Sequence, residues 1–202
     1  RQRQMCIRDS SAGLGKAPTK SDPDIYDHQY SHCDVLVVGG GISGIISAKL
    51  SAEKGLDTIL IDDKSFLGGS TIYQENECYK INSVNSNKWL ANEIESLKNY
   101  PNLLIKNRTS LAAFHGYNYL LARENLTDHL SINEKKGKVR QRLWKIRAKK
   151  VIIASGSIER PLIFSNNDRP GIILSSSIKK YIDYYGVKTC LLYTSPSPRD
   201  KR

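Results

Sequence analysis

Residues 34–63, DVLVVGGGISGIISAKLSAEKGLDTILIDD, combine two apolar strand patterns, a glycine-rich turn and a helical pattern. The apolar run 35–38 ends in glycines, as expected of a buried parallel strand. Small and apolar side chains then recur at helical spacing over 42–54, and Gly55 is placed to end that helix. A second apolar run occupies 57–62. Strand, helix and strand in this order predict a βαβ unit with a right-handed crossover.

The turn between the first strand and the helix, GGGISG at 39–44, matches the G-x-G-x-x-G pattern of dinucleotide-binding turns. Gly39 permits the tight turn, Gly41 lets a pyrophosphate approach the backbone, and Gly44 allows the helix to pack close to the strand. The helix N-terminus would present free N–H groups to the phosphates. A glycine-rich turn that binds no ligand is the alternative. The candidate cofactor-binding residues of this turn are Gly39, Gly40, Gly41, Ile42, Ser43 and Gly44.

An acidic residue closes the second strand, where its carboxylate can accept hydrogen bonds from both ribose hydroxyls of a dinucleotide. Asp62 lies at the end of the apolar run and is the preferred candidate, and the adjacent Asp63 is the alternative. A carboxylate here repels a 2′-phosphate, so NAD or FAD is expected rather than NADP. Nothing within 34–63 chooses between NAD and FAD.

Two further turns supply candidates for the same site. Gly69 belongs to a glycine pair at 68–69, which we interpret either as a neighbour of the dinucleotide or as a plain turn. Ser155 and Gly156 follow the run 151–154, which has the pattern of another buried parallel strand. No nucleophile–base pair or carboxylate dyad stands out, so no catalytic residue is predicted.

The composition excludes several other classes of protein. The 202 residues include 31 Lys and Arg against 20 Asp and Glu, a formal charge of +11. Much of this charge lies in 135–150, but apolar residues interrupt the run, so we expect a solvated hairpin face and no nucleic-acid partner. The apolar runs are too short to span a membrane, and no secretory signal is recognised. Four cysteines without a CxxC pair predict neither a zinc site nor a disulfide framework, which favours a reducing, cytoplasmic compartment.

Both ends resemble translated library-preparation adapters rather than protein. The segment 190–195, CLLYTS, back-translates as tgt ctc tta tac aca tct, and the reverse complement of this DNA, shifted in frame, encodes MCIRD at 5–9. We therefore expect 1–10 and 190–202 to be artefacts, with disordered basic tails as the alternative. Between them, we interpret 11–33 as a linker and 34–189 as one incomplete FAD/NAD-binding domain.

The rest of this domain alternates helical and strand patterns. We expect helices over 85–100 and 175–185, the second capped by its own serines, and a brief strand over 103–105. Irregular alternation over 111–147, with a polar turn at 133–138, predicts an antiparallel meander. The fold class is therefore α/β and Rossmann-like, with an antiparallel meander insertion.

The pattern over 34–63, LGGS at 67–70 and RLWKIRAKKVIIASGSIERPLIFSNNDRPGIILSSSIKKYIDYYG at 142–186 resemble the α subunits of heterotetrameric sarcosine oxidases. The resemblance covers 11–189. It implies an FAD/NAD(P)-binding domain of the two-dinucleotide-binding-domain flavoprotein type, in which Ser155 replaces the Thr of a usual ATG turn. It also implies that the glycine turn binds NAD.

For the intact enzyme, the resemblance implies partner subunits β, γ and δ and a cytoplasmic complex that also holds FAD, FMN and tetrahydrofolate. Sarcosine would be oxidatively demethylated to glycine with oxygen as acceptor, giving hydrogen peroxide and either formaldehyde or methylene-tetrahydrofolate. The alternatives are an α subunit of a related amine or opine oxidoreductase, and a structural dinucleotide platform without turnover. A disulfide-reductase-like enzyme is disfavoured, because 63–80 contains Cys78 but no CxxC pair.

Overall fold

A computed structural model describes residues 19, 21–73, 80–169 and 171–187 of the chain. The segments 1–10 and 190–202, which we expect to be adapter-derived, lie outside the described residues, and so does Cys78. No helix within the described part of the chain is long and apolar enough to cross a membrane.

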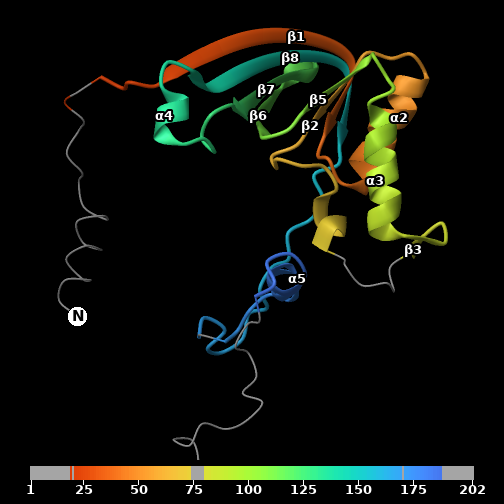
Figure 1. Cartoon of the computed structure of the whole chain (residues 1–202), viewed down its shortest axis with the longest axis vertical. Helices are drawn as coiled ribbons and strands as arrows, with labels where there is room; N and C mark the ends of the chain where they lie inside the picture. The colour runs from red at the N-terminus through yellow and green to blue at the C-terminus, as the bar shows by residue number, and fades with distance from the viewer. Residues whose placement is uncertain (1–18, 20, 74–79, 170, 188–202) are drawn as a thin grey trace, which may run out of the picture.

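The described residues form one six-stranded sheet and one two-stranded pair, and the helices over 42–53 and 86–97 lie beside one end of the larger sheet (Figure 1). The strands are β1 (Ile25–Val38), β2 (Thr58–Ile61), β3 (Lys80–Ile81), β4 (Val84–Asn85), β5 (Leu103–Lys106), β6 (Thr109–His115), β7 (Tyr119–Asn125) and β8 (Val139–Ile153). The helices are α2 (Ile42–Glu53), α3 (Ser86–Leu97), α4 (Ile132–Lys135) and α5 (Ser175–Asp183), with the 3-10 helices η1 (Gly69–Tyr73) and η2 (Gly116–Asn118).

The sheet order is β5-β2-β1-β8-β7-β6, with β3 and β4 forming a separate pair. β5, β2, β1 and β8 are parallel neighbours, whereas β6, β7 and β8 pair antiparallel. Within the parallel part, β1, the crossover helix α2 and β2 form the predicted βαβ unit, and the antiparallel part is the predicted meander. The predicted α/β, Rossmann-like fold with a meander insertion is therefore confirmed.

One cluster of buried apolar side chains covers each face of the sheet. Val37 and Leu60 pack with Ile45 and Ala48 of α2 on one face. On the other face, the core comprises Cys33, Leu36, Val38, Ile59, Ile61, Leu120, Ala122, Trp144, Ile146 and Ala148. Strand side chains alternate between faces, so both sides of β2 and of the end of β1 at 35–38 are buried, which explains why these two segments are continuous apolar runs.

The predicted linker is wrong at its C-terminal end, because β1 already begins at Ile25. Residues 25–33 pair with β8 along their length, from Ile25 opposite Val139 to Cys33 opposite Ala148. From Tyr26 to His32 the side chains are alternately exposed and half-buried, so this part of the chain lacks the apolar run that marks the second half of the strand. Main-chain pairing with β8 therefore forms this part of the strand without an apolar signal in its sequence.

The sequence also predicted a meander ending at 147 and a separate strand over 151–154, whereas β8 is one strand of 15 residues. It pairs with β7 near its start and with β1 throughout, so its polar residues lie in a two-sided ladder. The polar turn expected at 133–138 begins as the short helix α4, which Ser131 and Glu134 start with a reciprocal capping box.

Candidate functional site

A cleft of about 550 Å³ opens at the carboxyl ends of β1, β2 and β8. β1 lies between β2 and β8, so this is the point at which chain connections leave the sheet in opposite directions and where ligands bind in open α/β sheets. Ten of the eleven candidate cofactor-binding residues line it. The lining comprises Gly39, Gly40, Gly41, Ile42, Ser43, Ser47, Asp62, Asp63, Lys64, Gly68, Gly69, Ser70, Thr71, Ile152, Ile153, Ala154, Ser155, Gly156 and Ser157.

Two glycines of the first turn are required by packing. Gly39 has a φ of +107°, and a Cβ on it would overlap the carbonyl of Ala154 at the end of β8. A Cβ on Gly44 would overlap the carbonyl oxygen of Gly39. Gly44 is buried in α2 and is the one candidate that does not line the cleft. These contacts bring α2 close to the strand that precedes it.

Gly41 differs from these two glycines, because no atom lies within 4 Å of the position that its Cβ would take. It is the N-cap of α2, and no side chain caps the helix there. The first N–H groups of α2 and the positive end of its dipole therefore face an open part of the cleft. This arrangement fits the pyrophosphate of a dinucleotide.

The carboxylate of Asp62 joins the first turn to the loop after β2. It is only 8% exposed, its Oδ2 accepts a hydrogen bond of 2.5 Å from Gly40 N–H, and its Oδ1 accepts one of 2.8 Å from Lys64 N–H. Asp63 is exposed at the edge of the cleft. Each oxygen of Asp62 has a further lone pair, so the fixed carboxylate can also accept from ribose hydroxyls.

The second glycine loop packs directly on the first. Gly68 N–H donates to Gly40 O at 2.7 Å, and a Cβ on Gly40 would overlap the side chain of Leu67. A Cβ on Gly69 would lie 2.9 Å from Gly41 Cα. The two loops can approach this closely because glycines, which have no side chain, form the contact on both sides. The helix η1 then places Ser70 and Thr71 on the wall of the cleft.

The end of β8 forms the opposite wall. Ala154 N–H donates to Val38 O at 2.7 Å, which holds the residue that follows β8 beside the glycine turn. Ser155 and Gly156 follow directly on the lining of the cleft. Gly156 has a φ of +74°, and nothing lies within 4 Å of its missing Cβ, so the chain turns away here and leaves open space.

The sequence predicted that α5 is capped by its own serines, and this prediction is wrong. A carboxylate from an earlier loop caps the helix. Leu174 is the N-cap residue and has no side-chain cap. Instead, Glu159 accepts hydrogen bonds of 2.8 Å from both Ser175 Oγ and Ser176 N–H. Hydrogen bonds from Ser176 and Ser175 lower the pKa of Glu159 to about 2.

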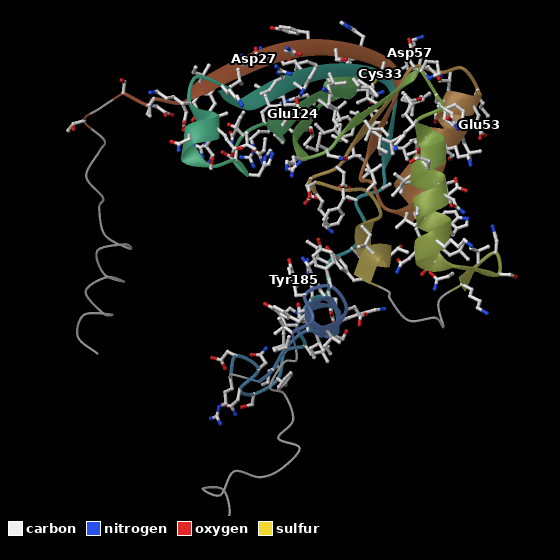
Figure 2. All side chains as sticks on the ribbon, viewed as in Figure 1. Asp27, Cys33, Glu53, Asp57, Glu124 and Tyr185 are labelled. Atoms are coloured by element: carbon white, nitrogen blue, oxygen red, sulfur yellow. The ribbon has the colours of Figure 1, made fainter. Side chains whose placement is uncertain are left out.

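The other end of α5 packs against η1. The ring of Tyr184 lies 5.2 Å from that of Tyr73 and 6.0 Å from that of Phe66. The neighbouring Tyr185 is labelled in Figure 2, below the sheet. Because Glu159 follows β8 and Tyr73 ends η1, α5 connects the two opposite walls of the cleft.

Several polar residues of the cleft were not predicted, namely Ser47, Lys64, Thr71 and Ser157. Ser47 follows Ser43 by one helical turn, and this spacing places both on one face of α2. Lys64 and Thr71 had no comparable signal, because their positions depend on how the loop after β2 folds back onto the first turn.

The histidines and Cys33 lie elsewhere. His28 and His32 are exposed on β1, and Cys33 is buried in the core, where burial raises the pKa of its thiol to about 11. Within the described residues, no group of three or more His, Cys, Asp or Glu side chains could hold a metal ion. The described cleft therefore offers backbone N–H groups, hydroxyls and a carboxylate for binding.

Replacing Glu159 with Gln is expected to loosen α5. The pKa of Glu159 is lowered from 4.5 to about 2 in the folded protein, so its contribution is complete above pH 4.5 and is lost as the pH falls towards 2. At neutral pH, Glu159→Gln should therefore reduce hydrogen-exchange protection of the α5 amides relative to those of α2. Glu95→Gln, at an exposed carboxylate paired with Lys98, is the control. Equal α5 protection in both variants would refute this anchoring role.

Comparison with known proteins agrees with this geometry. Residues 34–87 match the family described as FAD dependent oxidoreductase. Over 88% of its length, the chain is 36% identical to the sarcosine oxidase α subunit of Corynebacterium sp. strain U-96 and 34% identical to that of Rhizobium meliloti. L-proline dehydrogenase from P. horikoshii has a similar fold, with a TM-score of 0.61 and 24% identity over 84% of this chain and 31% of that one. The chain is therefore a homologue of the sarcosine oxidase α subunits over the 18% of their length that it spans.

Proposed function

We propose that the cleft binds NAD. A dinucleotide in this cleft is supported by the position of Asp62, a buried carboxylate that accepts from Gly40 N–H and Lys64 N–H, together with the uncapped N-terminus of α2. The choice of NAD rests on the resemblance to the sarcosine oxidase α subunits. In this arrangement the helix N-terminus and Gly41 would receive the pyrophosphate, and Asp62 would accept from the adenosine ribose. A bound nicotinamide would supply a hydride acceptor.

The charge of the cleft favours NAD over NADP. A 2′-phosphate would have to approach the buried carboxylate of Asp62, whose charge is not neutralised by an ion pair with any described residue. The repulsive energy between these two anions is largest where water is excluded and the effective dielectric constant is low. Lys64 also lines the cleft, and its ammonium lies 5.4 Å from the centre of the Tyr73 ring.

FAD is the second candidate for the same cleft. The same turn and acid would hold the ADP half of either dinucleotide, and the match to FAD-dependent oxidoreductases over 34–87 favours the flavin. The two candidates differ in the group beyond the pyrophosphate. Direct titration of the chain with NAD and with FAD therefore distinguishes them.

The homology supports a role in a multi-subunit oxidoreductase, because the relatives are named subunits of sarcosine oxidase. We propose that the whole protein is an α subunit that assembles with β, γ and δ subunits. That complex would demethylate sarcosine to glycine, with oxygen as acceptor and with FAD, FMN and tetrahydrofolate bound outside the described residues. The described part would contribute dinucleotide binding and no catalytic residue.

Two alternatives predict different behaviour of the bound dinucleotide. In an α subunit of an amine or opine oxidoreductase, the same cleft would serve another secondary amine. In a structural platform, the dinucleotide would remain bound without turnover. A change in the absorbance of bound nicotinamide after addition of sarcosine to the assembled complex indicates turnover of sarcosine. A change only with another secondary amine indicates the related oxidoreductase, and no change with any of these amines indicates the structural role.

Asp62→Asn tests the ribose interaction. Loss of a hydrogen bond to a charged group should weaken NAD binding by about tenfold or more, as measured by calorimetric titration. The preference for NAD over NADP should fall as well, because the variant removes the charge that repels the 2′-phosphate. Asp63→Asn is the matched control, since Asp63 is adjacent, acidic and exposed. A larger loss of NAD affinity in Asp63→Asn than in Asp62→Asn would show that Asp63, and not Asp62, binds the ribose.

Gly41→Ala and Gly44→Ala separate binding from packing. A methyl group on Gly41 meets no protein atom, so the thermal midpoint should stay within about 2 °C while dinucleotide affinity falls at least about tenfold. A methyl group on Gly44 overlaps Gly39 O, so this variant should unfold at a lower temperature even without ligand. Full affinity in Gly41→Ala would mean that the pyrophosphate does not lie over this turn.

A further inference from the structure

The outer face of the long β1–β8 pair, opposite the core that contains Trp144, carries two rows of side chains across neighbouring strands. One row joins Tyr30, Lys145 and Leu121, and the next joins His32, Arg147 and Tyr119. Trp144, Ile146 and Ala148 alternate with these residues along β8 and are buried in the core, so Lys145 and Arg147 lie on the opposite face. We refer to these six residues as the outer patch.

Aromatic rings hold the two cations of the outer patch in place. Lys145 Nζ donates to Tyr30 Oη at 3.1 Å and lies 4.9 Å from the centre of that ring. The Arg147 guanidinium lies 5.5 Å from the ring of Tyr119, which also contacts His115 at 5.8 Å. Tyr30 is 71% exposed. Cations ordered in this way lose less side-chain entropy when they meet a ligand.

Neither row contains a carboxylate. Asp34 lies beyond the second row and is already paired with Lys149 at 2.6 Å. The neighbouring arginines of β8 are neutralised, because Arg142 pairs with Asp27 at 2.8 Å and Arg140 pairs with Asp24 and Asp128. Asp27 is labelled on β1 in Figure 2. Within the described residues, Lys145 and Arg147 therefore differ from these two arginines in having no anionic partner.

An open strand edge lies beside the outer patch. β2 pairs with β1 only over Val35–Val38, whereas β8 pairs with β1 from Ile25 onward. Along 25–33, the side of β1 away from β8 therefore has no neighbouring strand among the described residues. Proteins usually cover or block edges of this length, and an added strand from another chain is one way to cover them.

We propose that the outer patch and the free edge of β1 form a docking surface for an extended, acidic segment of a partner protein. Main-chain hydrogen bonds along 25–33 would hold the segment, and carboxylates on side chains that reach across the face of β1 would meet Lys145, which leans towards β1, and beyond it Arg147. The edge favours a peptide over a nucleic acid, because it offers main-chain groups at strand spacing and not a groove of cations. This surface is separate from the dinucleotide cleft and does not depend on which cofactor binds there.

The test measures binding of a synthetic peptide of alternating Glu and Val to the full chain, by fluorescence anisotropy at low salt. Lys145→Glu with Arg147→Glu should weaken binding by about tenfold or more, since two favourable charge contacts become repulsive. The matched control is Lys54→Glu with Lys88→Glu, which changes the net charge equally at exposed lysines near α2 and α3. The control should retain affinity within about twofold.

The neutral pair Lys145→Gln with Arg147→Gln keeps the test informative if the charge-reversed protein does not fold. This pair should lower the affinity for the peptide by at least about threefold, whereas Lys54→Gln with Lys88→Gln should leave that affinity unchanged. No peptide binding, or equal weakening by patch and control variants, overturns the proposal. Tighter binding of a short oligothymidylate that depends on Lys145 and Arg147 also overturns it, since the face would then recognise nucleic acid.

Discussion

The parallel pairing of β1 with β8 is the constraint on which the rest of the structure depends. It runs from Ile25 opposite Val139 to Val38 opposite Ile153, and therefore spans both the meander and the βαβ unit (Figure 1). The same register ends with Ala154 N–H donating to Val38 O, which places the turn after β8 beside the glycine turn after β1. Both walls of the cleft thus follow from one strand pair.

Within the cleft, Asp62 sets both shape and charge. Its hydrogen bond from Gly40 N–H fixes the first turn against the end of β2, and Gly40 O in turn accepts from Gly68 N–H. Three chain segments are thereby joined by short polar contacts where side chains would not fit. The cleft consequently combines an open, positive helix N-terminus for phosphates with one buried carboxylate for a sugar, which are the two requirements of a dinucleotide.

The sequence predicted the parts of the fold that are encoded locally. The runs that became β1, α2 and β2 have strong periodicity, and the glycine spacing at 39–44 identifies a turn whose packing needs are visible in Gly39 and Gly44. The first half of β1 and the unbroken length of β8 were missed, because polar residues are held there by partners distant in the chain. The capping of α5 by Glu159 was missed for the same reason, since the two segments lie far apart in sequence.

We propose that NAD occupies the cleft between the first glycine turn and the end of β8, and titration of the ¹⁵N-labelled chain with NAD, followed by amide NMR, is the decisive measurement. We expect the largest shifts at Gly40, Gly41 and Gly156, which lie on both walls, and we expect that FAD does not displace NAD at equal concentration. Shifts confined to other residues, or the same shifts with FAD at lower concentration than with NAD, would contradict it.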